Sequence, residues 1–175
     1  MPRGNAIPRT INAIVWATRR WGTTSAAIPS GWDQILAPHR VTMPRRTVPS
    51  HVARPTYAES GVPQPASDRI HLIDTASELA KLRAACLMAA ETLNYACSLV
   101  AVGVTTEALD ESVHAWIVAR NAYPSPLNYR GFPKAICTSV NNVACHGIPD
   151  DRPLRSGDVV NLDVSVFFDG SVCTS

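Results

Sequence analysis

Residues 128–170 read NYRGFPKAICTSVNNVACHGIPDDRPLRSGDVVNLDVSVFFDG, and this stretch contains the strongest strand signal of the chain. It ends in VVNLDVSVFF at 159–168, a run rich in β-branched and aromatic residues. Asp169-Gly170, a two-residue hairpin signal, follows it. Apolar residues occur at both odd and even positions of this run, which predicts a strand buried on both faces.

Two shorter strands are expected immediately before this run. Residues 135–140 and 143–145 are rich in β-branched residues and are separated by Asn141-Asn142, a turn signal. Residues 147–151, which contain Gly, Pro and two Asp, are expected to form a loop. The sequence therefore predicts an antiparallel sheet at the C-terminal side of the chain.

Two helices are expected further upstream. Thr75 and Glu78 have the spacing of a capping box, and Gly103 ends the helical pattern. Between them, apolar residues recur at steps of three and four, at Leu79, Leu82, Cys86, Ala89, Leu93, Cys97 and Val100. A second helix begins after Thr105 or Thr106 and turns Leu109, Val113, Trp116 and Ile117 inward. Helices followed by antiparallel strands predict an α+β fold in which the helices pack on one face of the sheet.

Charge divides the chain into two regions. Residues 1–54 contain eight Arg and one acid, Asp33, whereas residues 55–175 contain eight Lys or Arg and thirteen acids. The first region is also rich in Ser, Thr and Pro, and a helix over residues 9–21 would be basic on one side, a composition typical of an organellar presequence. The alternative is a basic disordered or nucleic-acid-binding arm, which the absence of Lys and of alternating aromatic and basic residues disfavours. We therefore assign residues 1–50 to a presequence with a proline-rich linker, read by an import machinery, and residues 51–175 to the folded domain.

Other features of composition narrow the class of protein. No apolar run approaches the roughly 18 residues of a membrane span. Five cysteines without CxxC spacing argue against a disulfide framework and agree with a reducing compartment such as the mitochondrial matrix. We expect a mitochondrial location, with plastid or cytoplasm as alternatives, and no binding to nucleic acid.

Two residues of the quoted stretch stand out chemically. Asp163 is a carboxylate inside an otherwise apolar strand, where it needs either a metal ion or a structural partner such as Arg or backbone amides. His146 directly follows an expected strand and precedes Gly-Ile-Pro, so it is either a substrate-contacting imidazole or a structural histidine. His114, inside the second helix, is expected to be a packed or surface residue.

Several other polar and aromatic residues surround these two in sequence. Tyr129, Phe132 and Cys137 line an apolar pocket or belong to the core. The remaining charges near the turns are expected to be solvated or to cap turns: Asp150, Asp151, Arg152, Arg155 and Asp158.

Several contiguous blocks of the sequence resemble those of a known family. The chain carries YPSP at 123–126, FPK at 132–134, CTSV at 137–140, CHGIPD at 145–150 and NLDV at 161–164. These blocks resemble type I methionine aminopeptidases, and GVTTE at 103–107 and HVARP at 51–55 resemble their organellar, mitochondrial-type branch. The resemblance covers about residues 50–170.

The resemblance implies a pita-bread fold, of which this chain is the first half, and an enzyme that removes the initiator methionine from nascent proteins. Such an enzyme uses two divalent metal ions (Co, Mn, Fe or Zn) to activate water. By position, Asp163 matches a metal ligand, and His146 matches the histidine that contacts the scissile amide and stabilises the intermediate. Tyr129, Phe132 and Cys137 match the pocket for the methionine side chain.

One departure from the family pattern shapes our expectation for this chain. In the family, the strand after the Asp-Gly hairpin carries His-Gly-Asp, whose aspartate bridges both metals, whereas this chain has Val172-Cys173-Thr174. Thr174 thus occupies a ligand position, and the remaining ligands, one His and two Glu, belong to the second half of the fold. We expect a truncated and inactive aminopeptidase chain that keeps one metal ligand. The alternatives are a non-catalytic binding module with a pita-bread-like fold, or a fragment without function.

Overall fold

The computed structural model describes residues 15–16, 39–43, 45–65 and 73–174. Its helices are α1 (Ala76–Ser98) and α2 (Thr106–Val118), with a short 3₁₀ turn η1 (Tyr129–Gly131). Its strands are β1 (Val15–Trp16), β2 (Tyr123–Pro124), β3 (Cys137–Val140), β4 (Val159–Asp163), β5 (Ser165–Phe168) and β6 (Ser171–Thr174).

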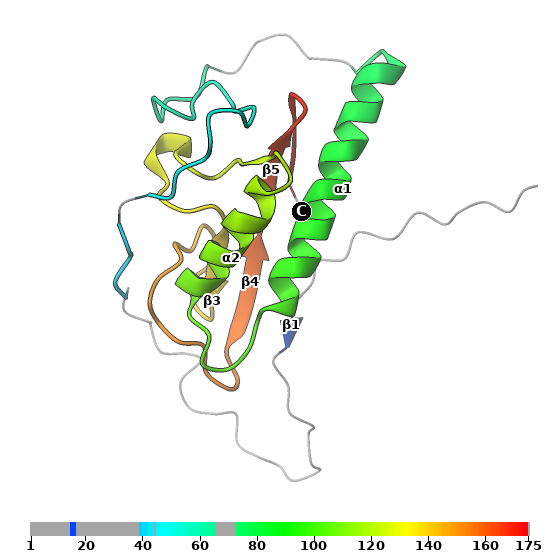
Figure 1. The fold of residues 1–175 in the computed structure, drawn as a ribbon. Helices are drawn as coiled ribbons and strands as arrows, with labels where there is room; N and C mark the ends of the chain where they lie inside the picture. The colour runs from blue at the N-terminus through cyan, green and yellow to red at the C-terminus, as the bar shows by residue number, and fades with distance from the viewer. Residues whose placement is uncertain (1–14, 17–38, 44, 66–72, 175) are drawn as a thin grey trace, which may run out of the picture.

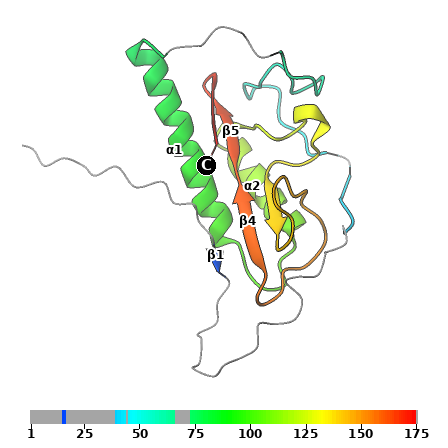
Figure 2. The same cartoon turned by 180° about the vertical axis from the view of Figure 1, so that it is seen from behind.

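The strands form two antiparallel sheets rather than one. β4 lies between β1 and β3, and β5 lies between β2 and β6. Both helices lie on the same side of these strands, and in Figure 2 the strands stand in front of α2, on a side where no helix is drawn. The α+β arrangement predicted from the sequence is confirmed (Figure 1).

The starts of both helices agree with their sequence signals, whereas α1 ends at Ser98, with Leu99 as its C-cap, before the predicted stop at Gly103. The Thr75 side chain accepts a hydrogen bond from the Glu78 N–H (3.1 Å), and the Glu78 carboxylate accepts one from the Thr75 N–H (3.3 Å), which completes the predicted capping box. Thr105 caps α2 by accepting a hydrogen bond from the Ala108 N–H at 3.1 Å.

The buried stripe of α1 is shifted from the predicted one. The residues that become buried are small: Ala85, Ala89, Thr92 and Ala96. Leu79 and Cys86, which the apolar periodicity placed on the inner face, are exposed, and Leu82, Leu93 and Cys97 are half-buried. Small side chains let the helix approach the strands closely, so the close contact falls on the alanines and the larger residues flank it.

The second helix buries the side that was predicted. Leu109, Val113 and Ile117 are each at most 1 % exposed and join the main hydrophobic core with Ile136, Val164 and Val166. At its outer edge, the indole of Trp116 stacks on Tyr95 of α1, with ring centroids 4.0 Å apart. The Arg120 guanidinium lies over the same indole, 3.2 Å from its centroid. This stack joins the two helices.

The run 159–168 is not a single strand. Val164, fully buried, separates β4 from β5, and the two strands join different sheets. Along β4, Val160 and Leu162 are buried whereas Val159 and Asn161 are exposed, so the expectation of burial on both faces was wrong. The predicted hairpin at Asp169-Gly170 is confirmed, since Phe168 pairs with Ser171. Residues 143–145, predicted to be a strand, form none. They lie in the loop that is hydrogen-bonded to β3 through Gly147.

The N-terminal region is described only in part. The helix expected over residues 9–21 lies outside the described residues except at Val15–Trp16, which form β1 and pair with β4 instead. Residues around Val52 pack in a small second core with Tyr123 and Leu127. Within the described part of the chain, no helix has the length and apolar character needed to cross a membrane.

Candidate functional site

Asp163 is placed at the end of β4, where the strand gives way to the buried Val164. Its cross-strand partner in β3 is Cys137. Its Oδ1 atom is buried and has no hydrogen-bond partner among the described residues. Burial raises the pKa of the Asp163 carboxyl above its ordinary value, although the nearby His146 acts in the opposite direction. The carboxylate therefore carries an unmet need for a cation or a donor.

The described residues do not complete a metal site around this carboxylate. Within residues 39–43, 45–65 and 73–174, no three His, Cys, Asp or Glu side chains gather in a way that could hold a metal ion. Divalent cations in proteins need several ligands, with six or more oxygens typical of the harder ones. Asp163 fits the role of one oxygen ligand, and this part of the chain does not by itself form a metal centre.

His146 is held by the loop that precedes and follows it. The Thr138 N–H donates a hydrogen bond to the Gly147 carbonyl (2.8 Å), and the Gly147 N–H donates one to Ser139 Oγ (3.2 Å). A Cβ atom on Gly147 would lie 2.1 Å from the Thr138 carbonyl oxygen, so only glycine allows this approach. His146 itself has a φ of 54° and an exposed side chain. The turn thus anchors the backbone to β3 and leaves the imidazole exposed.

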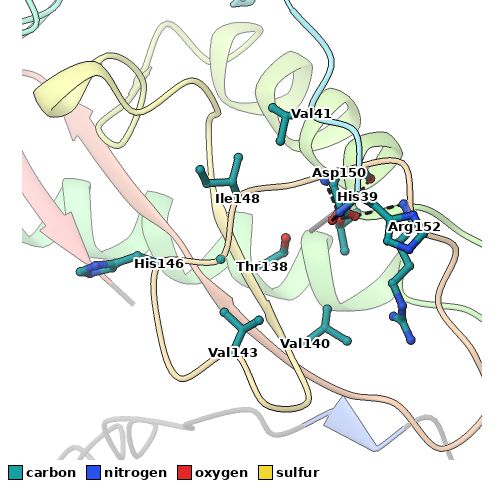
Figure 3. A pocket seen from close by; sticks show the side chains of 11 residues that line it. His39, Val41, Thr138, Val140, Val143, His146, Ile148, Asp150 and Arg152 are labelled. Carbon is teal, nitrogen blue, oxygen red and sulfur yellow. Dashed lines mark hydrogen bonds between the residues drawn. The ribbon is translucent and has the colours of Figure 1, made fainter. Parts of the chain in front are cut away.

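A hollow of about 300 Å³ lies beside this loop (Figure 3). Of the residues predicted for the site, His146 lines it, whereas Asp163, Cys137, Tyr129 and Phe132 do not. In Figure 3 the His146 ring lies apart from His39, Asp150 and Arg152 and points away from them. The surface of the hollow is mostly apolar and includes Val41, Val140, Val143 and Ile148. The hollow and the Asp163 carboxylate are therefore separate features that His146 adjoins.

The three residues predicted for an apolar pocket have different environments. Cys137 is 6 % exposed, and burial followed by the charge of Asp163 raises its thiol pKa to about 12, so the thiol is neutral at pH 7. Phe132 is half-buried. Tyr129 is 42 % exposed and packs edge-on against Tyr57, with centroids 5.1 Å apart. The structure thus brings Cys137 next to Asp163 and leaves Tyr129 and Phe132 in the segment before β3.

Two groups of charged residues were not found from the sequence. The first surrounds Asp110, which is fully buried in α2 and accepts hydrogen bonds from the N–H groups of Ala135 (2.7 Å) and Ile136 (3.2 Å). Its Oδ2 is 3.3 Å from Arg46 Nε, and Arg46 also contacts Glu107 at 2.6 Å. Glu107 in turn pairs with the buried Lys134. The four-residue spacing from Thr106 and the three-residue spacing to Val113 place Asp110 on the inner face of α2, which is the signal that could have located it.

The second group is the pair of Arg152 and Asp158. Of the two alternatives expected for these residues, solvation is wrong, because their side chains are 8 % and 9 % exposed and form two hydrogen bonds, of 2.9 and 3.1 Å. The turn-capping alternative holds for Asp158, which accepts a hydrogen bond from the Arg155 N–H at 2.8 Å. Burial would raise the pKa of Asp158, but hydrogen bonds from Arg152, the Arg155 N–H and Asn141 hold it below its ordinary value. This pair closes the turn that leads into β4.

Comparison with known proteins gives a consistent result. Residues 80–175, more than half of the chain, match the family described as Metallopeptidase family M24. The chain is 54% identical over 127 residues to methionine aminopeptidase 1B, chloroplastic, of Arabidopsis thaliana, covering 73% of this chain and 34% of that protein. It is 47% identical over 131 residues to methionine aminopeptidase 1 of Saccharomyces cerevisiae, again covering 73% of this chain and 34% of that protein.

Solved structures agree with the sequence relatives. The fold resembles the crystal structure of methionine aminopeptidase from Rickettsia prowazekii with a TM-score of 0.58 and 50% identity, covering 60% of this chain and 42% of that chain. It also resembles the enzyme of that name from Thermotoga maritima, with a TM-score of 0.57 and 26% identity, covering 60% of this chain and 43% of that one. The chain spans about a third of the length of these curated relatives.

Proposed function

The chain belongs to metallopeptidase family M24, and on this premise we propose that it carries the first part of the site of a methionine aminopeptidase, which removes the N-terminal methionine from nascent proteins. Because the chain spans about a third of its curated relatives, the activity belongs to a larger unit to which these residues contribute. Residues 51–175 are the proposed part of the catalytic domain.

The observation that carries this proposal is the unpartnered Oδ1 of Asp163. A buried carboxylate oxygen without a donor is costly in a purely structural role, and it is the expected state of a ligand whose metal and companion ligands come from elsewhere. The resemblance of the NLDV block at 161–164 to the family motif supports a metal-binding role for this aspartate. We propose that the remaining ligands for two divalent ions come from outside the described residues.

The other residues of the site have roles that follow from their chemistry. A divalent metal bound at such a site polarises a carbonyl and lowers the pKa of bound water. His146, exposed on a fastened turn, donates a hydrogen bond to the peptide at the scissile amide. Cys137, Phe132 and Tyr129 contact the methionine thioether, and the neutral Cys137 thiol places no charge beside it.

A non-catalytic binding module is the second candidate, and one observation favours it. Thr174 stands at the position where the family has a bridging aspartate, and its hydroxyl forms a 2.8 Å hydrogen bond with Ser165 across the β5–β6 pair. A neutral hydroxyl already engaged in a hydrogen bond does not replace a bridging carboxylate. In this reading the same fold recognises a partner without hydrolysis.

The location of the protein is also proposed. Relatives include chloroplastic and mitochondrial methionine aminopeptidases of Arabidopsis thaliana, and the first 50 residues are basic and nearly free of acids. We propose that residues 1–50 act as a presequence recognised by an import machinery, and that the destination is the mitochondrion.

The test combines metal binding with activity. The chain is co-expressed with a C-terminal part of a relative that includes the His-Gly-Asp strand and so supplies the bridging aspartate, and Mn²⁺ binding is measured by calorimetry alongside cleavage of a Met-Ala-Ser peptide. We expect cleavage in the assembled form, loss of metal binding in Asp163→Asn, and loss of cleavage with retained binding in His146→Ala. Asp151→Asn, an exposed carboxylate, is the matched control and keeps both.

Two results would decide against the enzyme. Assembly without cleavage favours the binding module. Metal binding that is equal in wild type and Asp163→Asn contradicts the proposed ligand.

A further inference from the structure

Two cysteines from opposite ends of the folded part lie side by side. Cys173 of β6 and Cys86 of α1 are 87 positions apart in the sequence, and their Sγ atoms are 2.8 Å apart. Both are free thiols in this structure. The other three cysteines of the chain, Cys97, Cys137 and Cys145, are free thiols as well.

The fold itself brings these two thiols together. Cys173 pairs with the buried Val166 of β5, and it packs with Phe168 against the main core, so its side chain shares the face of the hairpin that α1 covers. Cys86 is on the side of α1 that lies next to β6. In Figures 1 and 2 the C-terminal strand runs alongside α1 in both views. Neither thiol is on the strand or loop that carries Asp163 or His146, and Cys173 is next to Thr174, the residue at the family's bridging position.

We propose that Cys86 and Cys173 form a redox modification site, at which a small-molecule disulfide oxidises the two thiols to an intramolecular disulfide that locks β6 onto α1. A disulfide requires the sulfur atoms to be about 2.05 Å apart, so the pair needs to close by less than about 1 Å. Cys86 is exposed and accessible to the oxidant, and Cys173 is half-buried beside it.

The chemistry proceeds by two thiol–disulfide exchanges. The Cys86 sulfur, as thiolate, attacks the small disulfide and releases one small thiolate, which takes up the proton that Cys86 lost. The Cys173 sulfur then attacks the Cys86 sulfur of the mixed disulfide and releases the second small thiolate, which takes up the Cys173 proton. Two protein thiols are oxidised, and one disulfide is reduced to two thiols. Burial, followed by the contact with Cys86, raises the pKa of Cys173 to about 11, so this thiol is protonated at neutral pH and gives up its proton as it attacks.

The disulfide has a structural consequence. Among the described residues, β6 is an edge strand that pairs with β5 alone, and a covalent link to α1 closes a long loop between the first helix and the last strand. Constraining a long loop of the unfolded chain stabilises the folded state. The oxidised chain is therefore expected to hold its C-terminal hairpin more firmly than the reduced one.

The test uses the full chain with oxidised glutathione as the probe. Thiol titration is expected to fall from five to three, and peptide mapping without reductant is expected to show one link, between Cys86 and Cys173, that dithiothreitol reverses. The melting temperature should rise by several degrees on oxidation. Cys86→Ser and Cys173→Ser abolish the link, whereas Cys145→Ser, which removes another exposed thiol, leaves it unchanged.

Oxidation in concentrated guanidinium chloride shows whether the fold is responsible. In the unfolded chain, the short separation between Cys137 and Cys145 favours their pairing over a link across 87 positions. The same mixture of links in native and unfolded chains would overturn the proposal. So would glutathione adducts without an internal link in the native protein, or an unchanged melting temperature after the link has formed.

Discussion

Single residues fix the loop that presents His146. Gly147 has no left-handed φ, and its requirement for glycine comes from the Thr138 carbonyl against which it lies. Gly157 shows the opposite case, since it has a φ of +94° and open space around its α-carbon. One glycine is needed because of contact and the other because of conformation, and their substitutions should differ in cost.

We predict that Gly147→Ala destabilises the chain far more than Gly157→Ala. The added methyl of Gly147→Ala meets backbone atoms that cannot move without breaking the hydrogen bond between Thr138 N–H and the Gly147 carbonyl, at a cost of at least about 3 kcal/mol. Gly157→Ala carries only left-handed strain, roughly 1–2 kcal/mol. Denaturant unfolding of both variants measures the difference, and equal costs would show that the loop moves away from β3.

His114 gives the chain a dependence on pH. It is buried in α2, its Nε2 has no hydrogen-bond partner among the described residues, and burial together with Arg46 lowers its pKa to about 4. The unfolded chain binds a proton on this imidazole near pH 6.5, whereas the folded chain resists it. Its contribution to stability is therefore complete above about pH 6.5 and is lost as the pH falls toward 4.

We predict that His114→Leu removes this acid-dependent loss of stability. The wild type should lose a few kcal/mol of unfolding free energy between about pH 6.5 and 4, and the variant should lose much less over the same range. The control is His51→Gln, which changes an exposed histidine and should keep the wild-type slope. Urea unfolding at a series of pH values tests this, and an unchanged slope in His114→Leu would rule out the imidazole as the source.

At the scale of elements, the helix starts follow their local signals, whereas the contacts between elements do not follow from such signals. The capping residues of α1 and α2 stand where the sequence placed them. The run 159–168, in contrast, becomes two strands in two sheets, because Val164 turns into the core between them. Local capping depends on neighbouring residues, whereas the division of a strand depends on the partners available to each part.

We predict that Thr75→Ala destabilises α1 by about 1 kcal/mol, because it removes the side-chain acceptor of the Glu78 N–H. Thr75→Ser keeps the hydroxyl and should stay close to wild type. The nearby control is Ser77→Ala, in the first turn of the exposed helix end. Thermal unfolding followed by circular dichroism compares the three, and the prediction fails if Ser77→Ala costs as much as Thr75→Ala.

At the scale of the whole molecule, buried charges join the N-terminal segment to the helical layer. Arg46 bridges Glu107 and Asp110 of α2, and Lys134 donates a hydrogen bond to the Thr42 carbonyl (3.1 Å) while pairing with Glu107. Removing one member of such a group leaves the opposite charge buried without its partner. Thr42 and Arg46 are thereby tied to α2 and to the residues leading into β3.

We predict that Arg46→Met costs roughly 3 kcal/mol and increases amide exchange across residues 39–48. Arg45→Met, at the neighbouring exposed position, should have little effect. Hydrogen exchange with mass spectrometry, together with denaturant unfolding, measures both consequences. Equal protection of this segment in the two variants would show that contacts other than the Arg46 group hold it.

The amino-acid sequence by itself determined the class of fold, the starts of both helices, the Asp-Gly hairpin and the family. Each of these rests on neighbouring residues or on a contiguous motif, such as Thr75 with Glu78 or the CHGIPD block at 145–150. The residues expected for the site, Asp163 and His146 among them, were also located by motif, and their roles remain predictions.

Only the tertiary structure decided which charges are buried and which distant residues meet. Arg46 contacts Asp110, which is 64 positions away in the sequence, and Cys173 contacts Cys86, which is 87 positions away. The side chains of Arg152 and Asp158 are buried although both residues lie at a turn. No local pattern encodes such pairs, because the energy of each contact depends on burial and on partners that only the assembled layers provide.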